Sequence, residues 1–132
     1  MSRPRVLLVD DDAAIRAAVS SALAGEGYDV DWLADAQDAL RHVLAQPPAV
    51  LLLDIGLPGL DGWEICEILR RQSQTREMPV VFLTGRTAVR DRIIAMQVGG
   101  SDFISKPFRA RELRSKVRAL IGQDIGGAIG GR

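Results

Sequence analysis

Val50-Leu51-Leu52-Leu53-Asp54 is a run of four apolar residues that ends in a carboxylate. Such a run is typical of a strand that is covered on both faces, as in a parallel sheet. Three further strand-like runs lead into chemically active residues: residues 5–9 into Asp10, Asp11 and Asp12, residues 80–83 into Thr84, and residues 103–105 into Lys106. Because ligands bind beyond the carboxyl ends of the strands in an open α/β sheet, these residues predict a functional site at that edge.

The rest of the sequence alternates between helix and strand patterns. A half-exposed edge strand is predicted where Tyr28, Val30 and Trp32 alternate with acidic residues. Five segments carry apolar residues at helical spacing: Ile15, Ala18, Val19, Ala22 and Leu23; Ala36, Ala39, Leu40, Val43 and Leu44; Ile65, Ile68 and Leu69; Val89, Ile93 and Ile94; and Leu113, Val117, Leu120 and Ile121. Five strands alternating with five helices predict an α/β domain with a parallel sheet and helices on both faces.

The C-terminal residues differ from the rest in composition. Glycine occupies positions 122, 126, 127, 130 and 131, and a glycine-rich segment loses much conformational entropy when it becomes ordered. We therefore expect one domain over residues 1–121, followed by a flexible tail or linker over residues 122–132.

The bulk composition excludes several classes of protein. The 132 residues suffice for one domain, and 17 basic residues balance 17 acidic ones, so we expect neither a nucleic-acid nor a membrane partner. No signal peptide is apparent at the N-terminus. Cys66 is the only cysteine, which rules out a disulfide within the chain and suits a reducing cytoplasm. His42 has no partner residues for a zinc site in the sequence.

The carboxylates that follow the first and third strands predict a cation site. If these strands are neighbours, Asp10, Asp11, Asp12 and Asp54 converge, and a divalent cation relieves their mutual repulsion. Magnesium is the natural choice, because it takes oxygen ligands and shares phosphate oxygens. The alternative is that the acidic run only caps the first helix, and we expect Asp12 to do so in either case.

Asp54, Thr84 and Lys106 together indicate phosphoryl transfer. A loop follows Asp54, so this carboxylate has no helix to cap and is a candidate nucleophile toward phosphorus. Thr84 offers a hydroxyl to a phosphoryl oxygen, and Lys106 offers a positive charge. Phosphoryl transfer demands mainly positioning and electrostatic stabilisation, which these residue types supply.

Four motifs resemble the signatures of the receiver (CheY-like) domain of two-component response regulators. They are Val9-Asp10-Asp11-Asp12, residues 53–62 from Leu53 to Gly62, Leu83-Thr84-Gly85, and Lys106-Pro107-Phe108. The resemblance covers residues 4 to 121. It implies a flavodoxin-like three-layer sandwich of five β/α units with the strand order 2-1-3-4-5.

The resemblance also implies a role for each site residue. Asp54 is the expected phosphoacceptor. Asp11, Asp54 and the backbone carbonyl of Gly56 are expected to bind Mg²⁺ directly, and Asp10 through water. Lys106 is expected to contact the phosphoryl oxygens, and its bond to Pro107 is usually cis in this family.

Partners follow from the same resemblance. A sensor histidine kinase or a phosphotransfer protein is the expected phosphodonor. Thr84 and Phe103 match the family's switch pair, which changes a face formed by the fourth helix, the fifth strand and the last helix. The winged-helix subfamily of regulators forms dimers through contacts that match Arg92, Glu112 and Lys116. Formation of a homodimer on phosphorylation is therefore left open as an alternative. The product is a conformational state, and we expect a signalling module rather than an enzyme.

Three alternatives remain beside this interpretation. Asp10-Asp11-Asp12 contains the Asp-x-Asp arrangement of haloacid dehalogenase phosphatases, but Ala14 stands where that family has threonine or valine. A receiver-like scaffold that is never phosphorylated is the second alternative. The third concerns output: the chain is either a stand-alone receiver or the receiver portion of a longer regulator.

Trp32 is expected to pack at the sheet edge, and Trp63 to be partly buried near the third helix.

Overall fold

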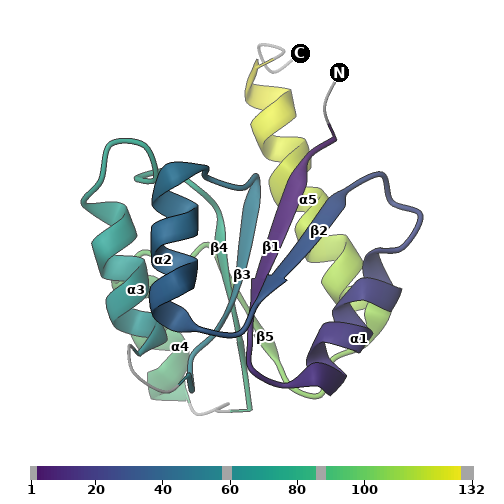
Figure 1. Cartoon of the computed structure of the whole chain (residues 1–132), viewed down its shortest axis with the longest axis horizontal. Coiled ribbons are helices and arrows are strands. Elements are labelled where there is room, and N and C mark those ends of the chain that lie inside the picture. The colour runs from purple at the N-terminus through teal and green to yellow at the C-terminus, as the bar shows by residue number, and fades with distance from the viewer. Residues whose placement is uncertain (1–2, 58–60, 86–88, 129–132) are drawn as a thin grey trace.

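A five-stranded parallel sheet lies at the centre of the computed structural model, which describes residues 3–57, 61–85 and 89–128 (Figure 1). The strand order is β2-β1-β3-β4-β5, and every neighbouring pair is parallel. The strands are β1 (Arg5–Val9), β2 (Asp29–Leu33), β3 (Val50–Asp54), β4 (Val80–Thr84) and β5 (Asp102–Ser105). This topology confirms the predicted fold class and strand order, including the position of β2 at the sheet edge.

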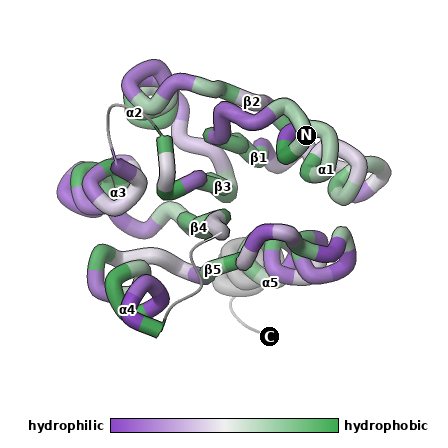
Figure 2. Tube along the Cα trace, turned by 90° about the horizontal axis from the view of Figure 1, so that it is seen from below, coloured by the Kyte–Doolittle hydropathy of each residue, from purple (hydrophilic) through white to green (hydrophobic). Residues whose placement is uncertain are grey.

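Helices cover both faces of the sheet. They are α1 (Ala13–Leu23), α2 (Ala36–Ala45), α3 (Gly62–Arg70), α4 (Val89–Gln97) and α5 (Ala110–Ala128). The view along the sheet shows α1 and α5 on one side and α2, α3 and α4 on the other (Figure 2). The result is the three-layer sandwich that the sequence predicts.

Alternate residues of each strand supply the two halves of the core. Leu7, Leu53 and Phe82 point toward α2 and α3, whereas Leu8 and Leu52 point toward α1 and α5. All five residues of β3 and of β4 are buried, as expected for central strands of a parallel sheet. This burial fixes the register of the strands, and the register sets which residues meet at the carboxyl edge.

Aspartates cap three of the helices. Asp12 accepts a hydrogen bond from the backbone N–H of Ala14 at the start of α1, as predicted, and Asp35 caps α2 by accepting from the backbone N–H of Asp38. Asp61 caps α3 by accepting from the N–H of Trp63 at 2.7 Å, which we did not anticipate. These caps define where each helix begins beyond the sheet.

Helix α4 differs from the sequence expectation. Two of the three apolar residues that predicted this helix face solvent, with Val89 74% and Ile93 52% exposed, whereas Asp91 and Ala95 are buried. The helix packs beside the edge strand β5, so only a narrow face of it is covered. Its apolar spacing therefore marks an exposed surface instead of a core face.

Helix α5 extends beyond the expected domain end. It continues to Ala128, past Gly122, where we placed the start of a flexible segment. Residues 129–132 lie outside the described residues. Within this helix Leu113, Val117 and Ile121 are buried in the core against α1 and the sheet. Among the described helices, none is both long and apolar enough to span a membrane.

Candidate functional site

The acidic residues meet because β1 and β3 are neighbours in register. Val9 pairs with Leu53, so Asp10 and Asp54 leave the sheet side by side at its carboxyl edge. One carboxylate oxygen from each of Asp10, Asp11 and Asp54 lies within 4.8 Å of the others. Asp10 and Asp54 are buried, and Asp11 is exposed. The convergence that the sequence predicts is therefore present for these three, whereas Asp12 is engaged as the cap of α1.

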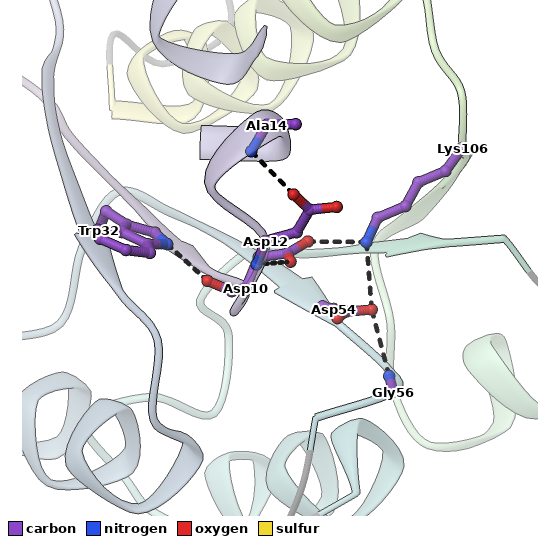
Figure 3. Close-up of polar contacts among 7 residues, drawn as sticks. All are labelled: Asp10, Asp12, Ala14, Trp32, Asp54, Gly56 and Lys106. Carbon is purple, nitrogen blue, oxygen red and sulfur yellow. Dashed lines mark hydrogen bonds and ion pairs between the residues drawn. The ribbon is translucent and has the colours of Figure 1, made fainter. Parts of the chain in front are cut away.

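Lys106 brings a positive charge to the same place (Figure 3). Its Nζ lies 2.8 Å from Oδ2 of Asp10 and 3.4 Å from Oδ1 of Asp54. The residue follows β5 directly, and its backbone N–H donates to the carbonyl of Thr84 at 2.8 Å. The Lys106–Pro107 peptide is cis, as the resemblance implies. The ammonium group thus lies between the two buried carboxylates.

The loop after β3 holds Asp54 from the other side. The N–H of Gly56 donates to Oδ1 of Asp54 at 3.2 Å. Gly62, the first residue of α3, approaches this loop so closely that a Cβ there would lie 2.9 Å from Cα of Ile55. Its N–H donates to the carbonyl of Ile55 at 3.3 Å. A glycine at position 62 therefore allows α3 to begin beside the phosphoacceptor candidate, a requirement that we did not recognise in the sequence.

Asp10 is fixed at its side chain and at its backbone. Oδ1 accepts the N–H of Asp12 at 2.9 Å, and the backbone N–H donates to the carbonyl of Leu33 at 3.1 Å. The backbone carbonyl accepts the indole N–H of Trp32 at 2.6 Å (Figure 3). We expected only edge packing from Trp32, so its contact with the site is a finding of the structure.

Burial shapes the electrostatics of this cluster. Burial raises the pKa of Asp10 above its ordinary value of 3.8, and the nearby charge of Asp54 acts in the same direction, against the hydrogen bonds from Lys106 and Asp12. Burial alone would lower the pKa of Lys106, but the carboxylates of Asp10 and Asp54 outweigh it and raise that pKa. The ammonium group of Lys106 therefore stays charged, whereas ionisation of Asp10 is disfavoured by its burial and by the neighbouring charge of Asp54.

The donor set fits a hard divalent cation. Three carboxylates face one ammonium group, which leaves a negative excess that a cation can neutralise. Oxygen ligands of this kind are those that Mg²⁺ prefers, and Mg²⁺ usually keeps several waters beside one or two carboxylates. Asp11, with its exposed side chain, gives such a cation access to the cluster.

The two predicted switch residues lie on the neighbouring strands β4 and β5. Thr84 ends β4 and is 3% exposed. Phe103 is half-buried on β5, and the guanidinium carbon of Arg92 lies 5.6 Å from the centre of its ring. Trp63, as expected, is half-buried, and its ring packs edge-on against Phe82 with the centres 4.8 Å apart. The placement of Thr84 and Phe103 suits their proposed roles, which stay predictions.

Comparison with known proteins identifies relatives over nearly the whole chain. A family model described as the response regulator receiver domain matches residues 6–118. The DNA-binding response regulator MtrA of Mycolicibacterium paratuberculosis is 39% identical over 119 residues, which make up 90% of this chain and 52% of MtrA. The chain spans about half the length of the curated relatives it matches.

Solved structures agree with this result. The chemotaxis response regulator CheY4 of Vibrio cholerae has a TM-score of 0.83 and 30% identity, covering 90% of this chain and 99% of CheY4. The receiver domain of the sensor histidine kinase PA1611 of Pseudomonas aeruginosa PAO1 has a TM-score of 0.83 and 31% identity, covering 92% and 99%. That structure holds a magnesium ion coordinated in its active site cleft.

Proposed function

The chain belongs to the response regulator receiver domain family, whose members are modules of two-component phosphorelay signalling and not classical enzymes, and we propose that it accepts a phosphoryl group on Asp54. The observation that carries this proposal is the meeting of Asp10, Asp11, Asp54 and Lys106 at the carboxyl edge of the sheet. Membership in this family sets aside the phosphatase alternative.

Asp11, Asp54 and the backbone carbonyl of Gly56 would hold Mg²⁺, with Asp10 acting through water. The bound ion would neutralise charge on the phosphoryl oxygens as they approach the carboxylates. The three carboxylate donors within 4.8 Å support this assignment, as does the magnesium ion in the related receiver domain. Asp10, which Lys106 already contacts, would help to set the charge of the site.

Phosphoryl transfer would exchange one bond to phosphorus for another. A carboxylate oxygen of Asp54 forms the new O–P bond while the N–P bond of a phosphohistidine breaks, and the proton that the histidine then needs comes from solvent. Lys106 would move from its contact with Asp54 to the transferred phosphoryl group, since both are anions within its reach. The Thr84 hydroxyl would donate to a phosphoryl oxygen.

The face formed by α4, β5 and α5 would transmit the change to a partner. Its groove is lined by Arg92, Met96, Asp102, Phe103, Ser105, Glu112 and Lys116. Thr84 and Phe103 would form the switch pair, because Phe103 lies both on this face and on the strand beside Thr84. Phosphorylation would then shift the equilibrium between two conformations of this surface.

Receiver domains interact with histidine kinases and with output domains. For this chain we infer a sensor histidine kinase or phosphotransfer protein as donor, and an output partner or a second copy on the face of α4, β5 and α5. The exposed apolar side chains Val89, Ile93 and Met96 support such a contact. A cytoplasmic location, where kinases of this kind transfer their phosphoryl groups, is part of the same proposal.

Mass spectrometry after incubation with acetyl phosphate tests the acceptor. We expect the wild type to gain one phosphoryl group in the presence of Mg²⁺ and none after chelation. Asp54→Asn should not be labelled, whereas Asp31→Asn, which changes an exposed aspartate on β2, should be labelled normally. Labelling of Asp54→Asn at the wild-type level would place the acceptor elsewhere.

A further inference from the structure

Trp32 contacts the candidate site from the side opposite Lys106 (Figure 3). Its indole Nε1 donates to the backbone carbonyl of Asp10 at 2.6 Å. Trp32 lies on β2 and pairs with Leu8 of β1, whereas Asp10 lies in the loop that follows β1. The side chain therefore reaches past the end of the strand pair.

The carbonyl of Asp10 belongs to the peptide unit that joins Asp10 to Asp11. A peptide unit is planar, so holding this oxygen limits how the plane can rotate. The N–H of Asp10 is held as well, by the carbonyl of Leu33 at 3.1 Å. Together these two bonds fix the backbone from which the carboxylates of Asp10 and Asp11 project.

The Trp32 ring is itself held in place. It packs against the buried residues between the sheet and α1, and the guanidinium carbon of Arg16 lies 4.3 Å from the centre of the ring. A cation at this distance over an indole is attracted by the ring face. The core residues and the guanidinium group of Arg16 thus hold the ring in the orientation that directs its N–H toward Asp10.

We propose that Trp32 is a positioning residue for the cation site. Through the carbonyl of Asp10 it orients the two consecutive carboxylates, Asp10 and Asp11, toward Asp54. This inference rests on the proposed function, because it takes the acidic cluster to be the Mg²⁺ site. The proposed role depends on the hydrogen bond from the indole N–H of Trp32, because packing of the ring alone would not require a tryptophan at this position.

The expected size follows from the behaviour of residues that orient metal ligands. Removing such a residue typically weakens metal affinity 10- to 100-fold. Trp32 acts through a backbone carbonyl and not on a ligand atom, so we expect the lower end of that range, about tenfold. The stability of the metal-free protein should change little if the aromatic ring is kept.

Titration with MgCl₂, followed by amide NMR, tests the proposal. Trp32→Phe keeps an aromatic ring on the core and beneath Arg16 but lacks the N–H donor. Trp63→Phe is the matched control, since it removes the tryptophan on α3, whose ring packs against Phe82. We expect an Mg²⁺ dissociation constant about tenfold higher for Trp32→Phe and unchanged for Trp63→Phe, with similar metal-free melting temperatures for the two variants.

The outcomes separate this inference from the function on which it rests. If the wild type binds Mg²⁺ and Trp32→Phe binds it within twofold of the wild type, the positioning role is wrong and the proposed function stands. Equal weakening in both variants would also overturn it. A wild type that neither binds Mg²⁺ nor accepts a phosphoryl group would remove both proposals.

A second measurement decides the matter if Trp32→Phe does not fold. Trp63→Phe contains a single indole, that of Trp32. We expect its indole N–H resonance to shift during the MgCl₂ titration with the same dissociation constant as the amides of the acidic loop. An indole resonance that does not move while those amides do would overturn the proposal.

Discussion

Asp10 carries the electrostatic character of the site at the scale of single residues. Its exposed fraction is 0%, and burial is the main reason that its pKa lies above 3.8. A carboxyl with a raised pKa in the folded protein favours folding below the ordinary pKa, and this contribution is lost as the pH rises through the raised value. Ionised Asp10 is therefore a cost to the metal-free fold that a cation offsets.

Mg²⁺ affinity should depend on pH through Asp10. Protons and Mg²⁺ compete for the carboxylates, and the raised pKa lets Asp10 keep its proton at a higher pH than an exposed aspartate. We expect the Mg²⁺ dissociation constant to rise on acidification through that pKa, starting above pH 3.8. Titrations at a series of pH values measure it. Asp10→Asn should bind more weakly but with a flatter pH profile, and an identical profile would contradict the assignment.

Lys106 should stabilise the metal-free protein and oppose the metal. Lys106→Met removes the ammonium group from two carboxylates, one of them fully buried, and should cost about 1–3 kcal/mol of unfolding free energy. The same change should tighten Mg²⁺ binding, since the competing charge is gone. Urea denaturation and MgCl₂ titration measure the two effects.

Lys116 supplies the matched control for that experiment. It pairs with Asp102 at 2.9 Å, but both side chains are about a third exposed. Lys116→Met should therefore cost less than about 1 kcal/mol and leave Mg²⁺ binding unchanged. Equal losses in the two variants, or weaker Mg²⁺ binding by Lys106→Met, would show that Lys106 is not the counter-charge of the cluster.

The sequence revealed the acidic residues and the lysine because each directly follows an apolar strand. It did not reveal the bond from Trp32 to Asp10, because a tryptophan at a sheet edge has the same pattern whether or not its N–H reaches a loop. Strand periodicity tells which face a side chain is on, but the reach of its polar atom depends on the rotamer.

At the scale of elements, the junction of β3 and α3 sets the position of Asp54. Gly62 begins α3 against the backbone of the preceding loop, where a Cβ would lie 2.9 Å from Cα of Ile55 and 3.1 Å from the carbonyl oxygen of Asp54. Both neighbours are backbone atoms, which cannot turn aside as a side chain can. The start of the helix and the end of the strand are therefore coupled.

Gly62→Ala should destabilise the protein by about 1–3 kcal/mol, the usual cost of overpacking. Gly85→Ala is the control, because a Cβ at position 85 meets nothing within 4 Å. That change should be neutral or stabilise by about 0.4–1 kcal/mol, since alanine restricts the unfolded chain. Chemical denaturation of both variants provides the comparison, and a Gly62→Ala protein as stable as the wild type would refute the close approach.

Element order was predictable from the sequence, but the orientation of α4 was not. The alternation of strands and helices gave the layers and the edge strand, since periodicity reports burial directly. In α4 the apolar residues Val89 and Ile93 face solvent and Asp91 is buried. Periodicity cannot distinguish a buried apolar face from an exposed one, and that ambiguity produced the difference.

At the scale of the whole molecule, the proposed cation site exists only in the folded chain. Asp10 and Asp54 are neighbours because β1 pairs with β3, and Lys106 joins them from the far end of the sequence. The unfolded chain has no such cluster, so Mg²⁺ should bind the native state and stabilise it.

Magnesium should accordingly raise the melting temperature. At a concentration 100 times its dissociation constant, the gain is about 2.7 kcal/mol, or roughly 10 °C for a domain of this size. Scanning calorimetry with MgCl₂, against NaCl of matched ionic strength, measures the shift. Asp54→Asn should lose most of it, and an equal shift in that variant would place the cation elsewhere.

The chain order of the site residues has a consequence for synthesis on the ribosome. The three carboxylates belong to the first half of the chain, whereas Lys106 follows the last strand of the sheet. Because a domain generally folds as a unit, the pairing of β1 with β3 and the arrival of Lys106 belong to the same folding event. The acidic residues and their internal counter-charge therefore come together only after nearly the whole domain has been translated.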